Sequence, residues 1–263
     1  MSNSSIGMGP QDTAERQKFE QELQRILETS ANAGVTLRVI GSLAFQLHCG
    51  TFGYLQAALG RAYTDIDFAG YSNERKAVRA LMSGLGYMEN QEVTVVSEGM
   101  RMIFDNPASG LHVDVFFDKL DFCHEIWWKN GRLGADAPTL PLAELLLEKM
   151  QIVKINEKDI IDTIMLLLEH PLGDSDAETI NIQRVAESCA ADWGLWRTTT
   201  MNLDKVGQLV TSYEQISDAD KAHVAAQVET ALQRINDQPK PMAWRLRDRV
   251  GDRVKWYKDV DEV

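Results

Sequence analysis

The chain has 263 residues, 44% hydrophobic and 25% charged, which is enough to bury a full core without disulfide or metal staples. The 39 Asp and Glu residues outnumber the 27 Lys and Arg residues, and the net charge of −12 disfavours a general coat for nucleic acid or anionic membrane. The three widely spaced cysteines form no CxxC pair, which disfavours a zinc ribbon or a thioredoxin-type site and suits a reducing cytosol.

The N-terminal segment lacks the basic and then apolar pattern of a signal peptide. The longest strongly apolar run, Ile160–Leu168, contains Asp162 and is too short to span a bilayer. We therefore expect a cytoplasmic protein with no membrane partner.

Residues 1–10 are small and polar, and we expect them to be disordered. The spacing of Phe19, Leu23, Ile26 and Leu27 predicts a helix that ends at Gly34. Residues 35–40 then predict a strand, and residues 43–48 a helix. The dipeptide Gly41-Ser42 therefore lies at a strand-to-helix turn.

The next segment, residues 50–63, is typical of a loop with one short helical turn. A strand is expected over 64–68 and a helix over 74–85. Residues 92–97 and 101–104 alternate around Glu98-Gly99, which predicts a β-hairpin. A turn at 106–110 and a further strand at 111–117 follow.

Helical periods dominate after Asp118. Helices are predicted over 142–155 and over 157–170, the second capped by Asn156 and ended by Pro171. Residues 175–263 are expected to be a helical region. The pattern predicts an α/β (α+β) protein with a boundary near 135–140, dividing an N-terminal core, 11–138, from a helical C-terminal region, 139–263.

The most informative motif is the acidic pair Asp65 and Asp67 in the predicted strand 64–68. Alternation places both carboxylates on one face, about 7 Å apart along the strand, where they repel each other unless a cation lies between them. Asp114 lies in another apolar strand. If the two strands are neighbours, three carboxylates converge, as in sites that hold two Mg²⁺ ions with a triphosphate.

The Gly41-Ser42 turn strengthens this interpretation. Glycine lets the backbone approach a phosphate closely, and a helix N-terminus presents free N–H groups to an anion. Each feature alone has a simpler explanation: Ser42 as a helix cap, and the acids as solvated strand residues.

The combination G-S…D-x-D…D resembles the nucleotidyltransferase superfamily related to DNA polymerase β. The AbiEii-like branch, which includes toxins of type IV toxin–antitoxin systems, is more similar still. Its G-[GS]-x-A turn is matched by Gly41-Ser42-Leu43-Ala44, and its R-x-[ST]-x-D-[IL]-D motif corresponds to the segment from Arg61 through Thr64 to Asp67. A Leu-rich helix with Lys149 and a K-D-x-x-D segment, Lys158 to Asp162, also fit. The likeness covers about residues 35–170.

The resemblance implies a nucleotidyltransferase-type mixed sheet with flanking helices. It also implies a reaction in which a nucleoside monophosphate passes from an NTP to an acceptor hydroxyl and pyrophosphate is released. Roles follow by position: Asp65, Asp67 and Asp114 as ligands of two Mg²⁺ ions, with Asp114 also a base. Gly41, Ser42, Arg61, Thr64 and Lys149 would bind nucleotide, and Asp159 would act near Lys149 or the acceptor.

Simpler roles exist in the second half of this pattern. Asp159 fits the capping arrangement that follows Asn156, Asp162 fits a solvated face, and Lys149 fits a surface pair with Glu148. His112, two residues before Asp114, fits a structural role.

The C-terminal residues 239–258 contain seven basic and two acidic residues. On one helix Arg245, Arg249 and Arg253 would share a face, and Leu246, Val250, Val254 and Tyr257 another. This segment could contact RNA or nucleotide phosphates, or be a packed amphipathic helix whose basic face meets the acidic body. Four tryptophans could either stack on nucleic-acid bases or pack between helices: Trp127, Trp128, Trp193 and Trp196.

The acceptor could be an RNA such as tRNA, a protein or a small molecule. The protein could also have an antitoxin partner. The rival class is a non-catalytic nucleotide-binding or interaction protein that retains the fold.

Overall fold

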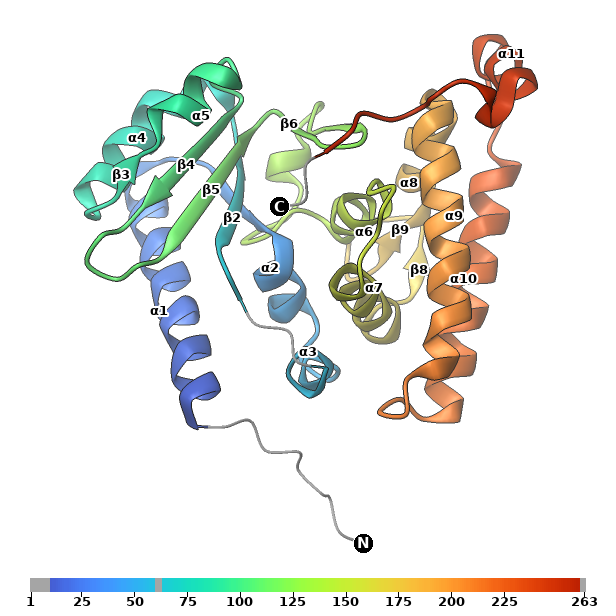
Figure 1. Cartoon of the computed structure of the whole chain (residues 1–263), viewed down its shortest axis with the longest axis horizontal. Coiled ribbons are helices and arrows are strands. Elements are labelled where there is room, and N and C mark those ends of the chain that lie inside the picture. The colour runs from blue at the N-terminus through green and yellow to red at the C-terminus, as the bar shows by residue number, and fades with distance from the viewer. Residues whose placement is uncertain (1–9, 60–62, 261–263) are drawn as a thin grey trace, which may run out of the picture. The chain divides into compact units, whose positions relative to one another are not determined.

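The computed structural model describes residues 10–59 and 63–260 of the chain, with side-chain burial described from residue 14 onward. Its described residues divide into two compact units. The first lies within Met1–Leu47, Gly53–Lys119 and Trp128–Leu140, and the second within His48–Phe52, Leu120–Trp127 and Pro141–Val263. The first unit is a mixed α/β unit and the second is mainly helical (Figure 1). No helix in the described ranges is long and apolar enough to cross a membrane.

The first unit is built on a mixed five-stranded sheet in the order β1-β2-β5-β4-β3. Its strands are β1 (Leu37–Ile40), β2 (Ile66–Gly70), β3 (Met88–Glu89), β4 (Arg101–Asp105) and β5 (His112–Phe117). Only the central β2–β5 pair is parallel; the others are antiparallel. This confirms the coarse prediction of an α/β protein with a mixed sheet and flanking helices.

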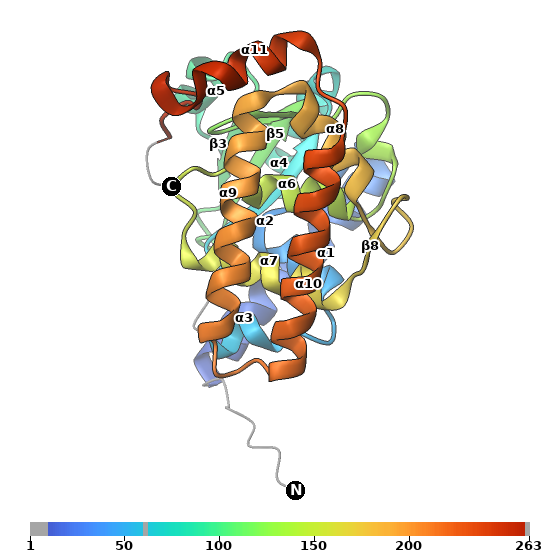
Figure 2. The ribbon, with the colours of Figure 1, turned by 90° about the vertical axis from the view of Figure 1, so that its right-hand side faces the viewer.

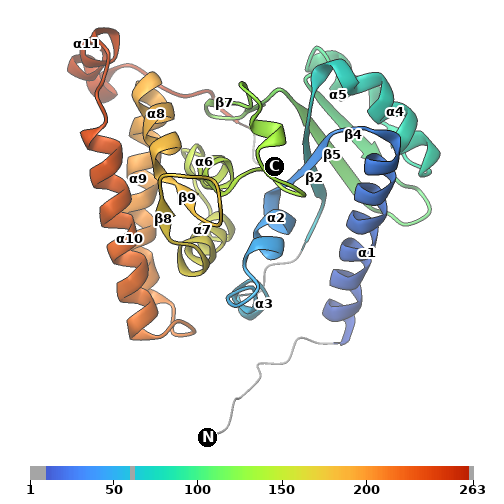
Figure 3. The same cartoon turned by 180° about the vertical axis from the view of Figure 1, so that it is seen from behind.

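Helix α1 (Pro10–Ala33) precedes these strands. The segments between them contain α2 (Gly41–His48), α3 (Tyr54–Ala58), the 3₁₀ turn Ser72–Glu74, α4 (Arg75–Gly84) and α5 (Gln91–Val96). The side chains of Phe19, Leu23 and Ile26 are buried along α1, and Gly34 ends that helix with a φ of +66°. Figure 3 shows α1 and α4 on one side of the sheet and α2 on the other.

Two predictions for the first unit need correction. Helix α1 begins at Pro10, so residue 10 is ordered, and the rest of the predicted disordered segment lies outside the described residues. The predicted hairpin over 92–104 is wrong, because residues 91–96 form α5, capped by Asn90, whose side chain accepts a hydrogen bond from the Val93 N–H. Local capping outweighs the β-branched Val and Thr residues there. Strand β4 pairs with β5 and β3 instead.

Short strands β6 (Lys119–Asp121) and β7 (Glu125–Trp127) form a two-stranded sheet, and a 3₁₀ turn follows at Arg132–Gly134. The helices of the second unit are α6 (Leu142–Met150), α7 (Glu157–Glu169), α8 (Ile182–Ala191), α9 (Trp193–Leu209), α10 (Asp218–Asp237) and α11 (Met242–Val250). The strands β8 (Leu172–Gly173) and β9 (Ile180–Asn181) lie between α7 and α8, and 3₁₀ turns follow α9 (Val210–Ser212) and α11 (Gly251–Arg253).

Helix α10 packs on α7, α8 and α9, and Figure 2 shows α9 and α10 side by side. Asn156 caps α7 as predicted: its side chain accepts a hydrogen bond from the Asp159 N–H at 3.0 Å. The predicted helix over 142–155 is shorter, ending at Met150.

Candidate active site

Asp67 and Asp114 stand side by side on the two central strands. Asp67 is in β2 and Asp114 in β5, and the parallel register makes them direct partners. Paired residues on neighbouring strands are about 4.8 Å apart and face the same side of the sheet. The register therefore brings together two of the three acids that the sequence singled out.

Asp65 lies one residue before β2, and Thr64 Oγ donates a hydrogen bond to Asp65 Oδ1 at 3.0 Å. Its negative charge is a minor cause of the raised pKa of Asp114. Asp65 and Asp67 are both half-buried, and Thr64 is exposed. Arg61 lies outside the described residues.

The turn at Gly41 approaches Asp67 directly. Gly41 begins α2 immediately after β1 with a φ of +67°, as the predicted strand-to-helix turn requires. A Cβ added to Gly41 would stand 2.2 Å from Asp67 Oδ2. Any other residue here would both strain the backbone and collide with the carboxylate. Ser42, which follows, is buried.

Asp114 is held on one oxygen and lacks a partner on the other. Arg101 donates to its Oδ2 from Nε at 2.8 Å and from Nη2 at 2.5 Å. Oδ1 is buried and has no hydrogen-bond partner among the described residues. Burial raises the pKa of Asp114 to about 6, opposed by Arg101 and reinforced by Asp65. A buried carboxylate oxygen without a partner is costly, which is a condition that a cation would relieve.

A ready three-carboxylate metal site is not formed. No group of three or more His, Cys, Asp or Glu side chains in the described parts of the chain is placed to hold an ion. The expected convergence of Asp65, Asp67 and Asp114 is thus only partly met, because Arg101 takes one oxygen of Asp114. Mg²⁺ is often bound by one or two carboxylates plus substrate phosphates, and Asp65 with Asp67 fit that smaller set.

Arg101 was missed by the sequence reasoning. The hairpin prediction paired the strand 101–104 with residues 92–97, whereas in the structure Arg101 pairs with Phe116, two positions from Asp114 on β5. An arginine in a strand of otherwise apolar alternation was the available signal. His112, the first residue of β5, pairs with exposed Asp105 on β4, which fits the structural role.

Lys149 and Asp159 belong to the second unit. The Lys149 ammonium lies 3.3 Å from Glu148 Oε1, 3.1 Å from Asp159 Oδ1 and 3.4 Å from Asp162 Oδ2. The Lys149 side chain is 8% exposed and that of Asp162 is fully buried. The predictions that Lys149 lies in a surface pair and that Asp162 lies on a solvated face are therefore wrong, because both side chains are buried where α6 packs against α7. Asp159 has the expected capping position, because its N–H donates to the Asn156 side chain, and its carboxylate also pairs with Lys149.

Helix α11 ends earlier than the basic segment implied. It stops at Val250, before Gly251, which has a φ of +58°. Arg253 therefore does not share a helical face with Arg245 and Arg249. The side chains of Leu246, Val250 and Val254 are exposed, so the apolar face of the expected amphipathic helix is not buried.

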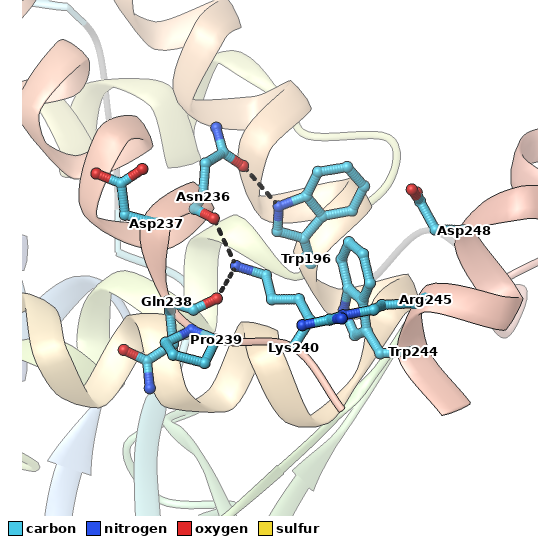
Figure 4. Close-up of a pocket in the computed structure, with 9 residues that line it drawn as sticks. All are labelled: Trp196, Asn236, Asp237, Gln238, Pro239, Lys240, Trp244, Arg245 and Asp248. Carbon is cyan, nitrogen blue, oxygen red and sulfur yellow. Dashed lines mark hydrogen bonds between the residues drawn. The ribbon is translucent and has the colours of Figure 1, made fainter. Parts of the chain in front are cut away.

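Tryptophans attach this segment to the second unit. Trp244 packs edge-on against Trp196 with ring centroids 4.9 Å apart, and Trp193 Nε1 donates to Asp248. An open depression of about 420 Å³ lies beside them. Figure 4 shows the residues that line it, with Lys240 bonded to the carbonyls of Asn236 and Gln238. Trp193 and Trp196 pack against each other and Trp128 is buried, as the helix-packing alternative expects.

Comparison of the chain with protein-family models, with curated proteins and with solved structures gave no match.

Proposed function

We propose that the chain is an Mg²⁺-dependent nucleotidyltransferase that moves a nucleoside monophosphate from an NTP to an acceptor hydroxyl. The observation that carries the proposal is the contact of the Gly41 backbone with Asp67, itself in register with Asp114. This contact places a glycine turn at a helix N-terminus next to two paired carboxylates. Such a turn suits the binding of a triphosphate, and the carboxylates suit the binding of the cation that accompanies it.

In this proposal, the first N–H groups of α2, around Gly41 and Ser42, bind phosphate oxygens. Asp65 and Asp67 hold magnesium, which when bound neutralises charge on the triphosphate. Thr64 orients Asp65 through the hydrogen bond to its Oδ1. Arg61 keeps the nucleotide-binding role that the resemblance implies.

We assign Asp114 to electrostatic support of the cation site rather than to proton abstraction. Its exposed fraction is 6%, and the oxygen without a partner is fully buried, so an acceptor hydroxyl has no direct access to it. Its charge next to Asp67 strengthens cation binding.

Lys149 keeps its proposed role in neutralising phosphate charge, and Asp159 its role beside Lys149. Within the second unit, three carboxylates surround the ammonium. Fixed positive charge aimed at a transferring phosphoryl group is a common catalytic device.

The acceptor and partners are also part of the proposal. A hydroxyl of RNA, protein or a small molecule serves as acceptor, and exposed Arg245 and Arg249 could meet RNA phosphates. A toxin-like activity with an antitoxin follows from the resemblance. A cytoplasmic location is supported by three cysteines that are all free and buried.

The test incubates the protein with each α-labelled NTP, Mg²⁺, total RNA and cell protein, and locates the label. We expect transfer to one class of acceptor with pyrophosphate release, lost by roughly 100-fold or more in Asp67→Asn. Asp105→Asn, on β4 and paired with His112, is the matched control and should keep activity.

NTP binding that needs Mg²⁺ but gives no labelled acceptor would favour the non-catalytic class. Absence of NTP binding to a folded wild-type protein would reject the enzyme and the nucleotide-binding alternative, and would favour an interaction protein that retains the fold. Thermal unfolding of each variant separates loss of chemistry from loss of fold.

A further inference from the structure

A line of three hydrogen bonds connects α1 to the glycine turn inside the first unit. Arg16 Nη2 donates to Tyr63 Oη at 2.9 Å, and Tyr63 Oη donates to Gln56 Oε1 at 3.2 Å. Gln56 Nε2 then donates to the Ser42 carbonyl oxygen at 3.3 Å. Arg16 lies in α1 and Tyr63 directly precedes Thr64. Gln56 lies in α3, and Ser42 is the second residue of α2.

The middle of this line is buried. Gln56 is fully buried and Tyr63 is 5% exposed. The Gln56 amide is engaged at both ends, its oxygen by Tyr63 and its nitrogen by Ser42, so its orientation is fixed by its partners. The Arg16 guanidinium carbon lies 5.2 Å from the Tyr63 ring centroid, and Phe19 packs edge-on against the same ring.

Packing alone does not require a glutamine here. A buried polar pair replaced by apolar groups of the same shape can be neutral or stabilising. A fully buried amide that contacts the carbonyl of the proposed phosphate-binding turn is therefore a sign of a role beyond filling the core.

The planar peptide bond transmits this contact to the site. In a trans peptide the carbonyl and the following N–H lie in one plane and point in opposite directions. By holding the Ser42 carbonyl, Gln56 also fixes the Leu43 N–H, one of the first four N–H groups of α2 that lack an intrahelical acceptor.

We propose that Gln56, oriented by Tyr63 and Arg16, is a positioning residue that aims the Ser42–Leu43 peptide at a phosphate group of the nucleotide. This inference rests on the proposed function. It adds Arg16 and Gln56, which lie outside the recognised motifs, and Tyr63, which lies within the segment from Arg61 to Asp67. A preorganised N–H group binds an anion without first losing conformational freedom, so loosening the turn should weaken phosphate binding.

The test compares Tyr63→Phe with Tyr87→Phe. Both tyrosines are buried in the first unit, and the Tyr87 hydroxyl donates to Glu22 Oε1 at 2.7 Å. Each change removes one hydroxyl: Tyr63→Phe loses the hydrogen bonds with Arg16 and Gln56, and Tyr87→Phe loses the one to Glu22. Only Tyr63 is connected to the turn. Gln56→Leu removes the amide itself and serves as a second variant.

The first readout is amide hydrogen exchange of peptides covering residues 41–46, without nucleotide. We expect exchange roughly 2- to 10-fold faster in Tyr63→Phe and in Gln56→Leu, as for the loss of one hydrogen bond, and unchanged exchange in Tyr87→Phe. Equal exchange in the wild type and all three variants would overturn the inference.

The second readout is the Kd for ATP with Mg²⁺. It should rise roughly 2- to 10-fold in Tyr63→Phe and stay unchanged in Tyr87→Phe. A faster-exchanging turn with an unaltered Kd would overturn the positioning role while leaving the proposed function in place. A wild-type protein that binds no NTP would instead reject the proposed function and, with it, the phosphate role of the turn.

Discussion

Gly41 lies so close to Asp67 that a β-carbon on residue 41 would stand 2.2 Å from the carboxylate oxygen Oδ2. The same residue has a φ of +67°. Gly41→Ala should therefore suffer both backbone strain of about 1–2 kcal/mol and a collision that displaces Asp67. We expect a lower free energy of unfolding and loss of Mg²⁺-dependent NTP binding, measured by urea denaturation and calorimetry.

Gly34→Ala is the matched control for this change. Gly34 has a φ of +66° but no atom within 4 Å of an added Cβ, so it carries the strain without the collision. If both variants lose the same stability and Gly41→Ala still binds NTP, the contact with Asp67 has no functional role.

The Arg101–Asp114 pair supports the central strands. Arg101→Met would leave a buried carboxylate without its cation, and we expect a loss of about 2 kcal/mol in the free energy of unfolding. This is below the value for a fully buried pair, because the Arg101 side chain is 28% exposed. Arg79→Met, which breaks the more exposed pair with Glu89, should cost about 1 kcal/mol or less. Equal losses would mean that Asp114 is better solvated than its burial indicates.

Asp114 should give the protein a distinct pH dependence. Its pKa is raised to about 6 in the folded state, chiefly by burial, against an ordinary value near 3.9 when unfolded. The folded state therefore binds the proton more tightly. The stability that this contributes is fully present below about pH 4 and is lost as the pH rises through 6.

The difference in unfolding free energy between the wild type and Asp114→Asn isolates this contribution. It should shift by up to about 3 kcal/mol between pH 4 and pH 7, to the disadvantage of the wild type at pH 7. The unpaired Arg101 in the variant adds an offset that does not change with pH. Parallel stability curves would contradict the raised pKa.

Much of the site's framework could be predicted from the sequence. Alternating apolar residues and glycines predicted the strand and turn at Gly41 and the strands that bear Asp67 and Asp114, and β1, α2, β2 and β5 confirm them. The register between Asp67 and Asp114 could not be predicted, because parallel pairing of distant strands depends on packing of the whole sheet.

Other features depended on interactions that periodicity does not encode. The Val93–Val96 run favours a strand by propensity, yet the Asn90 cap and its surroundings hold it in α5. Because this segment is a helix, the strand that bears Arg101 pairs with β5, which bears Asp114. Gln56 belongs to no motif, and only the fold brings its amide to Ser42.

Lys149 offers a test of the second unit. Lys149→Met would leave the carboxylates of Glu148, Asp159 and Asp162 together, with Asp162 fully buried. We expect a loss of about 3–5 kcal/mol in unfolding free energy at pH 7, because the change removes the cation from a buried cluster of carboxylates. Lys158→Met, at an exposed position on α7, should change it by less than about 0.5 kcal/mol. A Lys149→Met variant as stable as the wild type would show that the ammonium does not hold this cluster together.

Helix α11 shows that amphipathic spacing does not say which face is buried. Met242 and Leu246 are 68% and 52% exposed, whereas Trp244 donates from Nε1 to the Cys189 carbonyl and packs on Trp196. Leu246→Ser should therefore change the free energy of unfolding by less than about 0.5 kcal/mol, as for an exposed site. Trp244→Ala should cost about 2 kcal/mol or more and increase hydrogen exchange across residues 242–250, because it removes the packing on Trp196 and the hydrogen bond to Cys189. If Leu246→Ser proves the more damaging of the two, the apolar face of α11 is covered in solution.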